Sequence, residues 1–363
     1  MDAIVIGAGV VGASLALRLA QRGARVTLLE RGAPGTGTSG ASFAWTNANQ
    51  KEPRDYYELN LAGMRAHRAL REELGGAPWL CEGGTLELAT AALADELEQR
   101  LARLRGWGYR AEWLDRAAIA ELEPGLRPDD AIEGAAWFPD EDAIDAPLLA
   151  ASLTQLAVAH GATLRVGAEV VGVTRDGERV SGVTLRDGTR LAADVIVNCA
   201  GPRANAIAQL AGRRLPLAPT PGLIVRVAGG ADLVRRVVHA PLLHMRPDSN
   251  GLLLLHSADA DEALANGGAP RPWLAELLAR AQGYLPALAA PSVARWGVGV
   301  RPIPADERTS AGAVPTLPGY AEVVTHSGVT LGPLLGGLVA HELLTGEVNP
   351  LLAPFRPERF GAA

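Results

Sequence analysis

The start of the chain alternates between short apolar runs and one longer amphipathic stretch. Residues 3–6 are apolar and are followed by glycines, which is typical of a buried parallel strand. Residues 10–21 carry apolar side chains at helical spacing, and Gly23 follows at the position where helices commonly end. Because residues 24–29 form a second apolar run, we expect a strand, a helix and a parallel strand in succession.

Helical periodicity recurs further along the chain. We expect helices at residues 54–74, 93–104, 147–159 and 273–282, and a final helix from about Pro333 to Thr345. The residues that follow the second strand, 32–42, are rich in Gly, Thr and Ser and are expected to form a loop.

The middle of the chain predicts a β-meander. Asp176-Gly177 and Asp187-Gly188 each separate two strand-like segments, and Asp-Gly pairs are typical of hairpin turns. The strands expected here are residues 163–166, 170–174, 180–185 and 191–198. Three prolines follow within residues 212–222, which we interpret as a crossing between domains. The strands expected for a second sheet are residues 223–227, 242–245 and 252–256.

Composition narrows the class of protein. A chain of 363 residues with 48% hydrophobic side chains is long enough for two packed domains. Its net charge of -6 offers no basic excess for phosphates, so no nucleic-acid partner is expected. Cys81 and Cys199 lie far apart, which favours buried thiols over a disulfide or a metal site. Neither a signal peptide nor a membrane-spanning run is evident, so a cytoplasmic location is expected.

The strongest chemical motif lies between the first strand and the first helix. Gly7, Gly9 and Gly12 form a Gly-x-Gly-x-x-Gly sequence, and Glu30 ends the next strand 18 residues later. The glycines let the backbone approach a pyrophosphate closely, and the helix N-terminus presents free N–H groups to it. Glu30 can accept hydrogen bonds from both ribose hydroxyls. This context predicts a dinucleotide site, although it does not separate FAD from NAD.

Four parts of the sequence resemble the D-amino-acid-oxidase-like superfamily of FAD enzymes, which includes glycine oxidase, sarcosine oxidase and D-amino acid dehydrogenase. They are residues 4–31, residues 38–43, residues 194–201, and the pair 298–302 (Val-Gly-Val-Arg-Pro) with 326–333 (His-Ser-Gly-Val-Thr-Leu-Gly-Pro). These parts follow the family's order over nearly the whole chain.

The resemblance implies an α/β (α+β) fold with two domains. One is a Rossmann-like FAD-binding domain of the glutathione-reductase type, assembled from separated segments, and the other is a substrate domain with a mixed β-sheet. The expected FAD-binding segments are 1–46, 147–215 and 297–363, and the expected substrate-binding segments are 47–146 and 216–296.

The resemblance also assigns the FAD contacts. They are Gly7, Gly9, Val10, Val11, Gly12, Glu30, Arg31, Thr38, Ser39, Ala41, Ser42, Val170, Ala200, Gly201, Arg301, Gly328, Val329, Thr330 and Leu331. Residues 328–332 would lead into the helix near Pro333, whose positive end would stabilise negative charge on the reduced flavin. A helix cap without a ligand is the alternative for these residues.

The cofactor is expected to be non-covalent FAD. Sarcosine oxidase holds its flavin through a cysteine near the C-terminus, whereas no cysteine follows Cys199 here. Dimethylglycine-type enzymes attach the flavin through a histidine just after the Ser-Gly loop, and none lies between Gly40 and Lys51.

Three residues are candidates for catalysis or substrate binding. Arg301 matches the arginine of a Gly-x-Arg-Pro sequence that binds the substrate carboxylate in glycine oxidase, with a structural ion pair to an acid such as Asp306 as the alternative. His244 is aligned with a substrate-contacting tyrosine of glycine oxidase, with simple packing as the alternative. Lys51, the single lysine, would lie beside the flavin, with chance composition as the alternative.

The reaction that we expect is oxidation of the C–N bond of a small amine or amino acid. A hydride would move from the α-carbon to flavin N5, and the resulting imine would hydrolyse. Oxygen or an electron carrier would accept the electrons. Two alternatives stay open: oxidation of a 2-hydroxy acid or polyol phosphate on the same fold, and a flavin-bearing subunit of a larger dehydrogenase complex. The oligomeric state is also left open.

Overall fold

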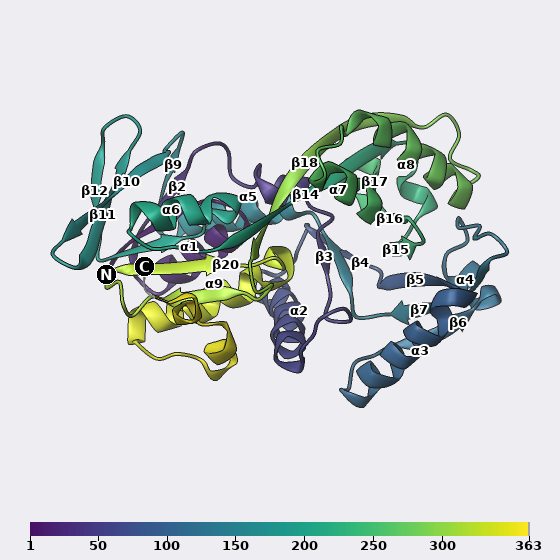
Figure 1. Ribbon diagram of the computed structural model, residues 1–363, viewed down its shortest axis with the longest axis horizontal. Coiled ribbons are helices and arrows are strands. Elements are labelled where there is room, and N and C mark those ends of the chain that lie inside the picture. The colour runs from purple at the N-terminus through teal and green to yellow at the C-terminus, as the bar shows by residue number, and fades with distance from the viewer. Residues whose placement is uncertain (362–363) are drawn as a thin grey trace.

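The computed structural model describes residues 1–361 and contains two large β-sheets connected by two long strands (Figure 1). The connecting strands are β14 (Leu217–Ala228) and β18 (Ser292–Pro304). They pair antiparallel from Leu217 opposite Pro304 to Ala228 opposite Ser292. The paired strands therefore run from one half of the molecule to the other, with one register shift between Arg226 and Val227. The strand β18 crosses the domain boundary expected at residue 297.

The first large sheet has six strands in the order β19-β20-β13-β1-β2-β9. Their bounds are β1 (Asp2–Ile6), β2 (Arg25–Glu30), β9 (Thr163–Val166), β13 (Val195–Asn198), β19 (Ser310–Ala313) and β20 (Tyr320–Val324). The central strand β1 pairs in parallel with both β2 and β13. The first helix, α1 (Val10–Gln21), has the predicted bounds. The βαβ start and the α/β fold class are confirmed.

Helices cover one face of this sheet and a small sheet covers the other. The helices α1, α5 (Ala146–Ala159) and α9 (Gly328–Thr345) share one apolar core with β1. A second core joins the opposite face to α6 (Ala204–Leu210) and to the sheet of β10 (Val170–Asp176), β11 (Arg179–Leu185) and β12 (Arg190–Ala192). The two Asp-Gly hairpins are confirmed. The single strand expected over residues 191–198 is wrong, because it divides into β12 and β13, which belong to different sheets.

The last helix begins earlier than the sequence predicts. It starts at Gly328 and contains Pro333, whereas we expected its start near Pro333. A proline inside a helix leaves the carbonyl four residues earlier without its N–H partner. Here that carbonyl, Val329 O, lies 2.8 Å from the Nε2 atom of the buried His67. The His67 side chain therefore satisfies the carbonyl that the proline leaves free, and the helix continues.

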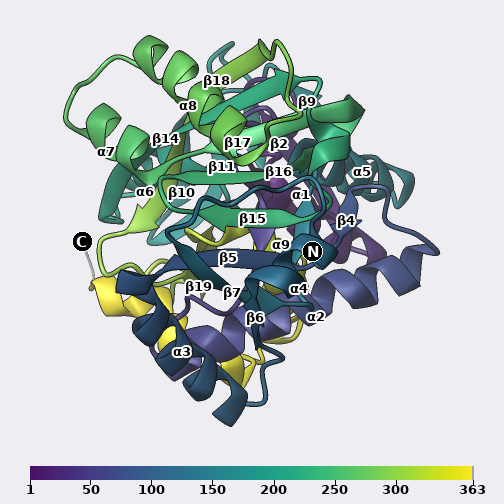
Figure 2. The same ribbon diagram turned by 90° about the vertical axis from the view of Figure 1, so that its right-hand side faces the viewer.

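The second large sheet has eight strands in the order β18-β14-β17-β16-β15-β5-β7-β6. The remaining bounds are β5 (Thr85–Thr90), β6 (Glu112–Asp115), β7 (Ile132–Phe138), β15 (Val237–Ala240), β16 (Leu243–Asp248) and β17 (Leu252–His256). In Figure 2, β17, β16, β15 and β5 lie side by side. The helices α4 (Arg116–Leu122), α7 (Ala258–Ala265) and α8 (Arg271–Tyr284) pack in one core with this sheet, while α2 (Arg54–Leu74) and α3 (Ala91–Gly106) join a separate core. The strands β5 to β7, β15 and β18 were not predicted.

A fourth sheet is small and has three strands. It contains β3 (Trp45–Thr46), β4 (Leu80–Glu82) and β8 (Asp142–Ile144), with β8 in the centre. Among residues 1–361, α9 is the one helix that is long and apolar enough to cross a membrane by length and composition. Half of it is buried, and it packs against α1 and α2, which is the behaviour of a core helix.

Candidate active site

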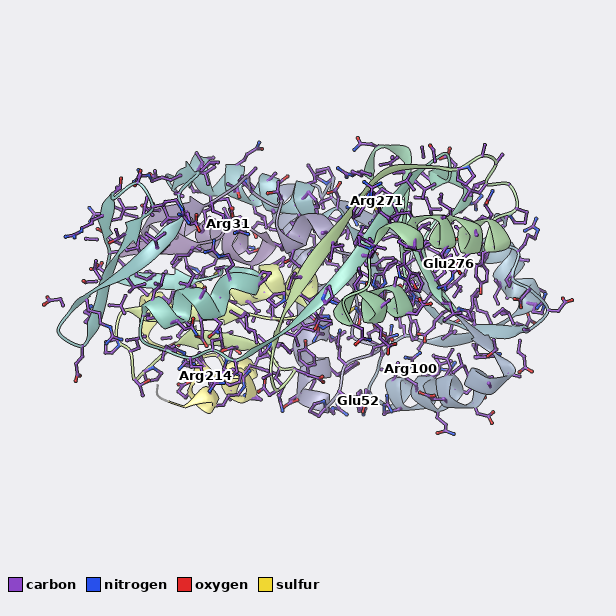
Figure 3. All side chains as sticks on the ribbon, turned by 45° about the horizontal axis from the view of Figure 1, so that its top comes forward. Arg31, Glu52, Arg100, Arg214, Arg271 and Glu276 are labelled. Atoms are coloured by element: carbon purple, nitrogen blue, oxygen red, sulfur yellow. The ribbon has the colours of Figure 1, made fainter. Side chains whose placement is uncertain are left out.

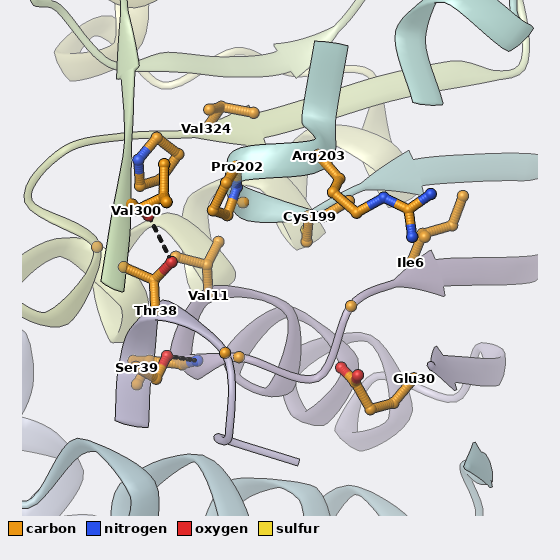
Figure 4. A pocket seen from close by; sticks show the side chains of 18 of the residues that line it. Ile6, Val11, Glu30, Thr38, Ser39, Cys199, Pro202, Arg203, Val300 and Val324 are labelled. Carbon is orange, nitrogen blue, oxygen red and sulfur yellow. Dashed lines mark hydrogen bonds between the residues drawn. The ribbon is translucent and has the colours of Figure 1, made fainter. Parts of the chain in front are cut away.

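A cavity of about 450 Å³ runs along the carboxyl ends of β1, β2 and β13 (Figure 4). It is lined by the glycine motif, by the loop that contains the short 3₁₀ helix Thr38–Ala41, and by the start of β10. The end of β13, one edge of β18 and the start of α9 complete it. Crevices at the carboxyl ends of parallel strands are the usual ligand sites of such sheets.

The glycine motif forms a turn that no larger residue would fit. Gly7 has a φ of +102°, and a Cβ atom there would lie 2.6 Å from the carbonyl oxygen of Cys199. A Cβ atom on Gly12 would lie 1.9 Å from the carbonyl oxygen of Gly7. Gly12 therefore allows α1 to start tightly against the turn, but it does not line the cavity itself. Such a cradle brings backbone N–H groups to a pyrophosphate and fits a dinucleotide.

Glu30 braces this turn from the end of β2. Its Oε2 atom accepts a hydrogen bond from Ala8 N at 2.9 Å, and its Oε1 atom accepts one from Gly32 N at 2.7 Å. Each carboxylate oxygen keeps a further lone pair, so the residue can still accept ribose hydroxyls. Both Glu30 and Arg31 line the cavity.

The loop after Glu30 is attached to both α1 and β18. Thr38 Oγ1 donates to Val300 O at 2.7 Å, and Val10 N donates to Ser39 Oγ at 3.3 Å (Figure 4). Gly299 permits this close approach, because a Cβ atom there would lie 2.4 Å from Ala41 O. The loop thus closes one wall of the cavity.

Most of the expected FAD contacts line this cavity. The residues that do are Gly7, Gly9, Val10, Val11, Glu30, Arg31, Thr38, Ser39, Ala41, Ser42, Val170, Ala200, Gly201, Gly328 and Val329. The exceptions besides Gly12 are Arg301, Thr330 and Leu331. Thr330 Oγ1 donates to Trp45 O, and Leu331 packs in the core under α1. The individual FAD contacts stay predictions.

Sequence reasoning missed further lining residues at both ends of the cavity. At one end Arg203 Nη1 donates to Glu169 Oε1 at 2.8 Å. Two ion pairs with arginines hold the pKa of the Glu169 carboxyl well below its usual range. Residues 35–37, 298–300 and 323–325 also line the cavity. These residues lie next to the predicted FAD contacts in the sequence. This proximity was the signal that could have identified them.

Arg301 lies beside the cavity and is engaged by the protein itself. Its Nη2 atom donates to Asp261 Oδ2 at 2.7 Å and to Pro221 O at 2.9 Å. The alternative expected from the sequence, a structural ion pair, is therefore present, although its acid is Asp261. Asp306 instead accepts from Arg359 Nε at 2.6 Å.

His244 belongs to a row of three histidines on neighbouring strands. His239, His244 and His256 lie opposite one another in the register of β15, β16 and β17. The Nδ1 atoms of His239 and His244 lie 2.6 Å apart, and the rings of His244 and His256 stack with centroids 5.4 Å apart. Phe43, which follows the cavity loop, lies over this row. Burial lowers the pKa of His244 to about 4, so its ring is neutral near pH 7.

The positive charges of Lys51 and Arg301 both act on His326, which lines the cavity next to α9. Burial, followed by the positive charges of Lys51 and then Arg301, lowers the pKa of His326 to about 4. Burial lowers the pKa of Lys51 to about 8, and the nearby Glu141 opposes that shift. Both predicted cations therefore lie close enough to the α9 end of the cavity to act on His326, although neither lines the cavity.

Glu141 is a fully buried acid that sequence reasoning missed. It accepts hydrogen bonds from Tyr109 at 2.6 Å, Asn49 at 2.7 Å and Trp45 at 2.8 Å. Burial raises the pKa of its carboxyl to about 7 despite these donors. No sequence motif marks Glu141, because its partners come from distant segments.

Within the part of the chain that the structure describes, no group of three or more His, Cys, Asp or Glu side chains could hold a metal ion. The candidate site combines the dinucleotide cavity with His326 at its α9 end, where the charges of Lys51 and Arg301 act on that histidine.

Comparison with known proteins identifies the class to which this arrangement belongs. Residues 2–342 match the FAD dependent oxidoreductase (DAO) family, and the chain belongs to that family. It is an FAD-dependent enzyme, as the sequence predicts.

Individual relatives match over nearly their full length. Glycine oxidase from Geobacillus kaustophilus is 31% identical in sequence, over 98% of this chain and 96% of the relative. Hydrogen cyanide synthase subunit HcnC from Pseudomonas aeruginosa is 27% identical, over 98% and 97%. The crystal structure of the same glycine oxidase superposes with a TM-score of 0.85 at 28% identity, over 98% of this chain and 97% of that one. Iminodiacetate oxidase (IdaA) from Chelativorans sp. BNC1 superposes with a TM-score of 0.83 at 28% identity, over 98% of each chain.

Proposed function

We propose that this FAD-dependent oxidoreductase oxidises the carbon–nitrogen bond of a small amine or amino acid. The observation that carries the proposal is the α9 end of the cavity, where His326 lines the wall and the positive charges of Lys51 and Arg301 act on it. Glycine oxidase and iminodiacetate oxidase, whose names denote amine substrates, support it.

The residues at this end have distinct roles in the proposal. Arg301 orients the carboxylate of an amino-acid substrate through the guanidinium atoms that its protein partners leave free. Lys51 Nζ, whose pKa is about 8, accepts the proton of the substrate ammonium when it is itself neutral. FAD, when bound, supplies the acceptor for the hydride that leaves the α-carbon.

The histidine row and the aromatic residues above it form the apolar wall of the substrate site. Trp45 lies against His239 with ring centroids 4.3 Å apart, and Phe43 lies against His256 at 5.8 Å. Since His244 is neutral near pH 7, it adds no positive charge to this wall of the substrate site. A neutral amine is the form from which a hydride can be removed.

Anaerobic titration of the holoenzyme with a panel of amines and amino acids tests the proposal. We expect at least one member to bleach the flavin absorbance, which requires no knowledge of the electron acceptor. The panel includes 2-hydroxy acids and polyol phosphates. Bleaching by those compounds alone would replace the proposal with C–O oxidation.

A second candidate function is that of a flavin-bearing subunit in a larger dehydrogenase. It is favoured by one relative, HcnC, which is named as a subunit of hydrogen cyanide synthase. The purified single chain decides between the two. If it turns over a substrate with an artificial acceptor, the catalytic centre is contained in this chain.

A further inference from the structure

Asp261 on α7 is a buried carboxylate with three hydrogen-bond donors. Its Oδ1 atom accepts from Leu223 N at 2.8 Å. Its Oδ2 atom accepts from His256 Nε2 at 2.8 Å and from Arg301 Nη2 at 2.7 Å. Only 6% of the Asp261 side chain is exposed, against 31% of the Arg301 side chain. The acid is therefore held in place, and the arginine is the partner that remains open to the substrate site.

This contact changes how Arg301 can bind a second carboxylate. An Nη2 atom carries two hydrogens, and those of Arg301 are directed to Asp261 Oδ2 and to Pro221 O. A carboxylate that binds a guanidinium with two parallel hydrogen bonds uses two neighbouring nitrogens. Both possible pairs, Nε with Nη2 and Nη1 with Nη2, include the occupied atom. While Asp261 stays in place, a substrate carboxylate is limited to a single nitrogen of the guanidinium.

The negative charge of Asp261 also opposes the binding of a second carboxylate at Arg301. Many charged side chains of this protein point to solvent, such as Arg214, Arg271 and Glu276 (Figure 3), where water screens them. Asp261 is buried, so its negative charge is screened much less and offsets the positive charge of Arg301. A substrate carboxylate at Arg301 meets both the cation and this neighbouring anion.

We propose that Asp261 is a specificity-determining residue that weakens the hold of Arg301 on substrate carboxylates. The pocket then accepts small amines with or without an α-carboxylate at similar affinity. The proposal rests on the proposed function, because it concerns the same substrate site. Asp261 acts through Arg301 and is a positioning residue.

The experiment compares Asp261→Asn with a matched control in the holoenzyme. Asn keeps the shape and an acceptor oxygen but removes the charge. The control is Asp259→Asn, on the same helix, because Asp259 also pairs with an arginine, Arg280, at 2.8 Å. Binding of acetate is followed by the perturbation of the flavin absorbance, which requires no turnover.

We expect Asp261→Asn to bind acetate about tenfold more tightly than the parent, because one fixed negative charge beside the cation is removed. Asp259→Asn should bind acetate as the parent does. A gain in affinity cannot come from a damaged structure. Unchanged or weaker acetate binding by a folded, flavin-loaded Asp261→Asn protein would overturn the proposal.

A second measurement needs no variant and covers the case in which Asp261→Asn fails to fold. The parent is titrated with acetate and with acetamide, its neutral isostere. A guanidinium free to bind with both nitrogens would favour acetate by about 100-fold, whereas we expect a preference below about tenfold. A preference near 100-fold contradicts the proposal.

The proposed function has a separate outcome in the same experiments. If acetate binding responds as expected but no amine bleaches the flavin, the amine-oxidising function fails while the role of Asp261 stands. If amines bleach the flavin but acetate affinity is unaffected by Asp261→Asn, the role of Asp261 fails while the amine-oxidising function stands.

Discussion

The Lys51 ammonium lies 5.9 Å from the centre of the Tyr56 ring. The hydroxyl of Tyr56 in turn lies 3.0 Å from Ser327 Oγ, at the residue that caps the N-terminus of α9. The single lysine of the chain is therefore connected through one side chain to the helix end that borders the cavity. A cation over an aromatic face is attracted electrostatically by the ring.

We predict that Lys51→Arg will fold and bind FAD but will lose about 10- to 100-fold in the reductive or the oxidative half-reaction. Arginine is larger and always charged, so it cannot be neutral in this position. Rapid-mixing measurements separate the two half-reactions. The matched control is Arg54→Lys, an exchange at a nearby exposed position, which should leave both rates unchanged.

The pH dependence of the reductive half-reaction follows from the same residue. Burial lowers the pKa of Lys51 to about 8, so the neutral amine becomes the major form above that pH. We expect the rate to rise as the pH increases through about 8, and we expect this step to be missing from Lys51→Arg. If both half-reactions of Lys51→Arg match those of the parent, the lysine has no role in the reaction.

The buried carboxyl of Glu141 should make the stability of the folded protein depend on pH. Its pKa is raised from an ordinary value of 4.5 to about 7 by burial. Between these values the carboxyl ionises in the unfolded chain while it stays protonated in the folded protein, so stability falls as the pH rises. The loss is complete above about pH 7 and amounts to at most about 3 kcal/mol.

The test is chemical unfolding of the parent and of Glu141→Gln at about pH 5 and about pH 8. We expect the free energy of unfolding to differ less between the two conditions in Glu141→Gln than in the parent. The exposed Glu58, which pairs with Arg54 on α2, provides the control variant Glu58→Gln. An equal pH dependence in the parent and Glu141→Gln would show that Glu141 does not titrate in this range.

The cofactor should be released by denaturation. We predict that the purified protein is yellow and that acid or heat frees intact FAD into the supernatant, measured by chromatography of the extract. Colour that stays with the precipitated protein would contradict non-covalent binding.

Gly12→Ala should lower the FAD content strongly, because its Cβ atom would collide with Gly7 O. Gly76→Ala, where an added Cβ meets no atom within 4 Å, is the control.

Arg301 should affect carboxylate substrates selectively. We predict that Arg301→Ala keeps its FAD content but binds amino-acid substrates about tenfold more weakly, near the lower limit for a charge-assisted hydrogen bond, because Asp261 already occupies Nη2. Arg301→Lys should show a similar loss. The comparison of KM for an amino acid with KM for the matching amine checks this. Equal KM values for the amino acid in Arg301→Ala and the parent would remove Arg301 from substrate binding.

Features that depend on neighbouring residues were predictable from the sequence. The turn at Gly7 and Gly12 is one example, because local sterics and the helix start specify it. The hairpins at Asp176-Gly177 and Asp187-Gly188 are another. The start of α9 was not predictable, because the side chain that satisfies the carbonyl freed by Pro333 comes from His67, on a different helix.

The partners within the site depend on tertiary contacts between distant segments. The acid that pairs with Arg301 lies 40 residues earlier in the chain, and it is brought close by the pairing of β14 with β18 and the packing of α7 on β14. The row formed by His239, His244 and His256 depends on the register of three strands. No local pattern specifies such a register, so the sequence could indicate His244 but not that it lies between His239 and His256.

The cavity is built from segments far apart in the order of synthesis. Its first wall, the glycine motif, precedes residue 13, whereas β18, β20 and the start of α9 follow residue 291. On the ribosome, the early strands β1 and β2 must wait for β20 and α9 before the six-stranded sheet and the cavity are complete. Many long-range contacts of this kind slow folding and leave apolar strand edges exposed. The complete cavity can therefore form only after nearly the whole chain has been synthesised.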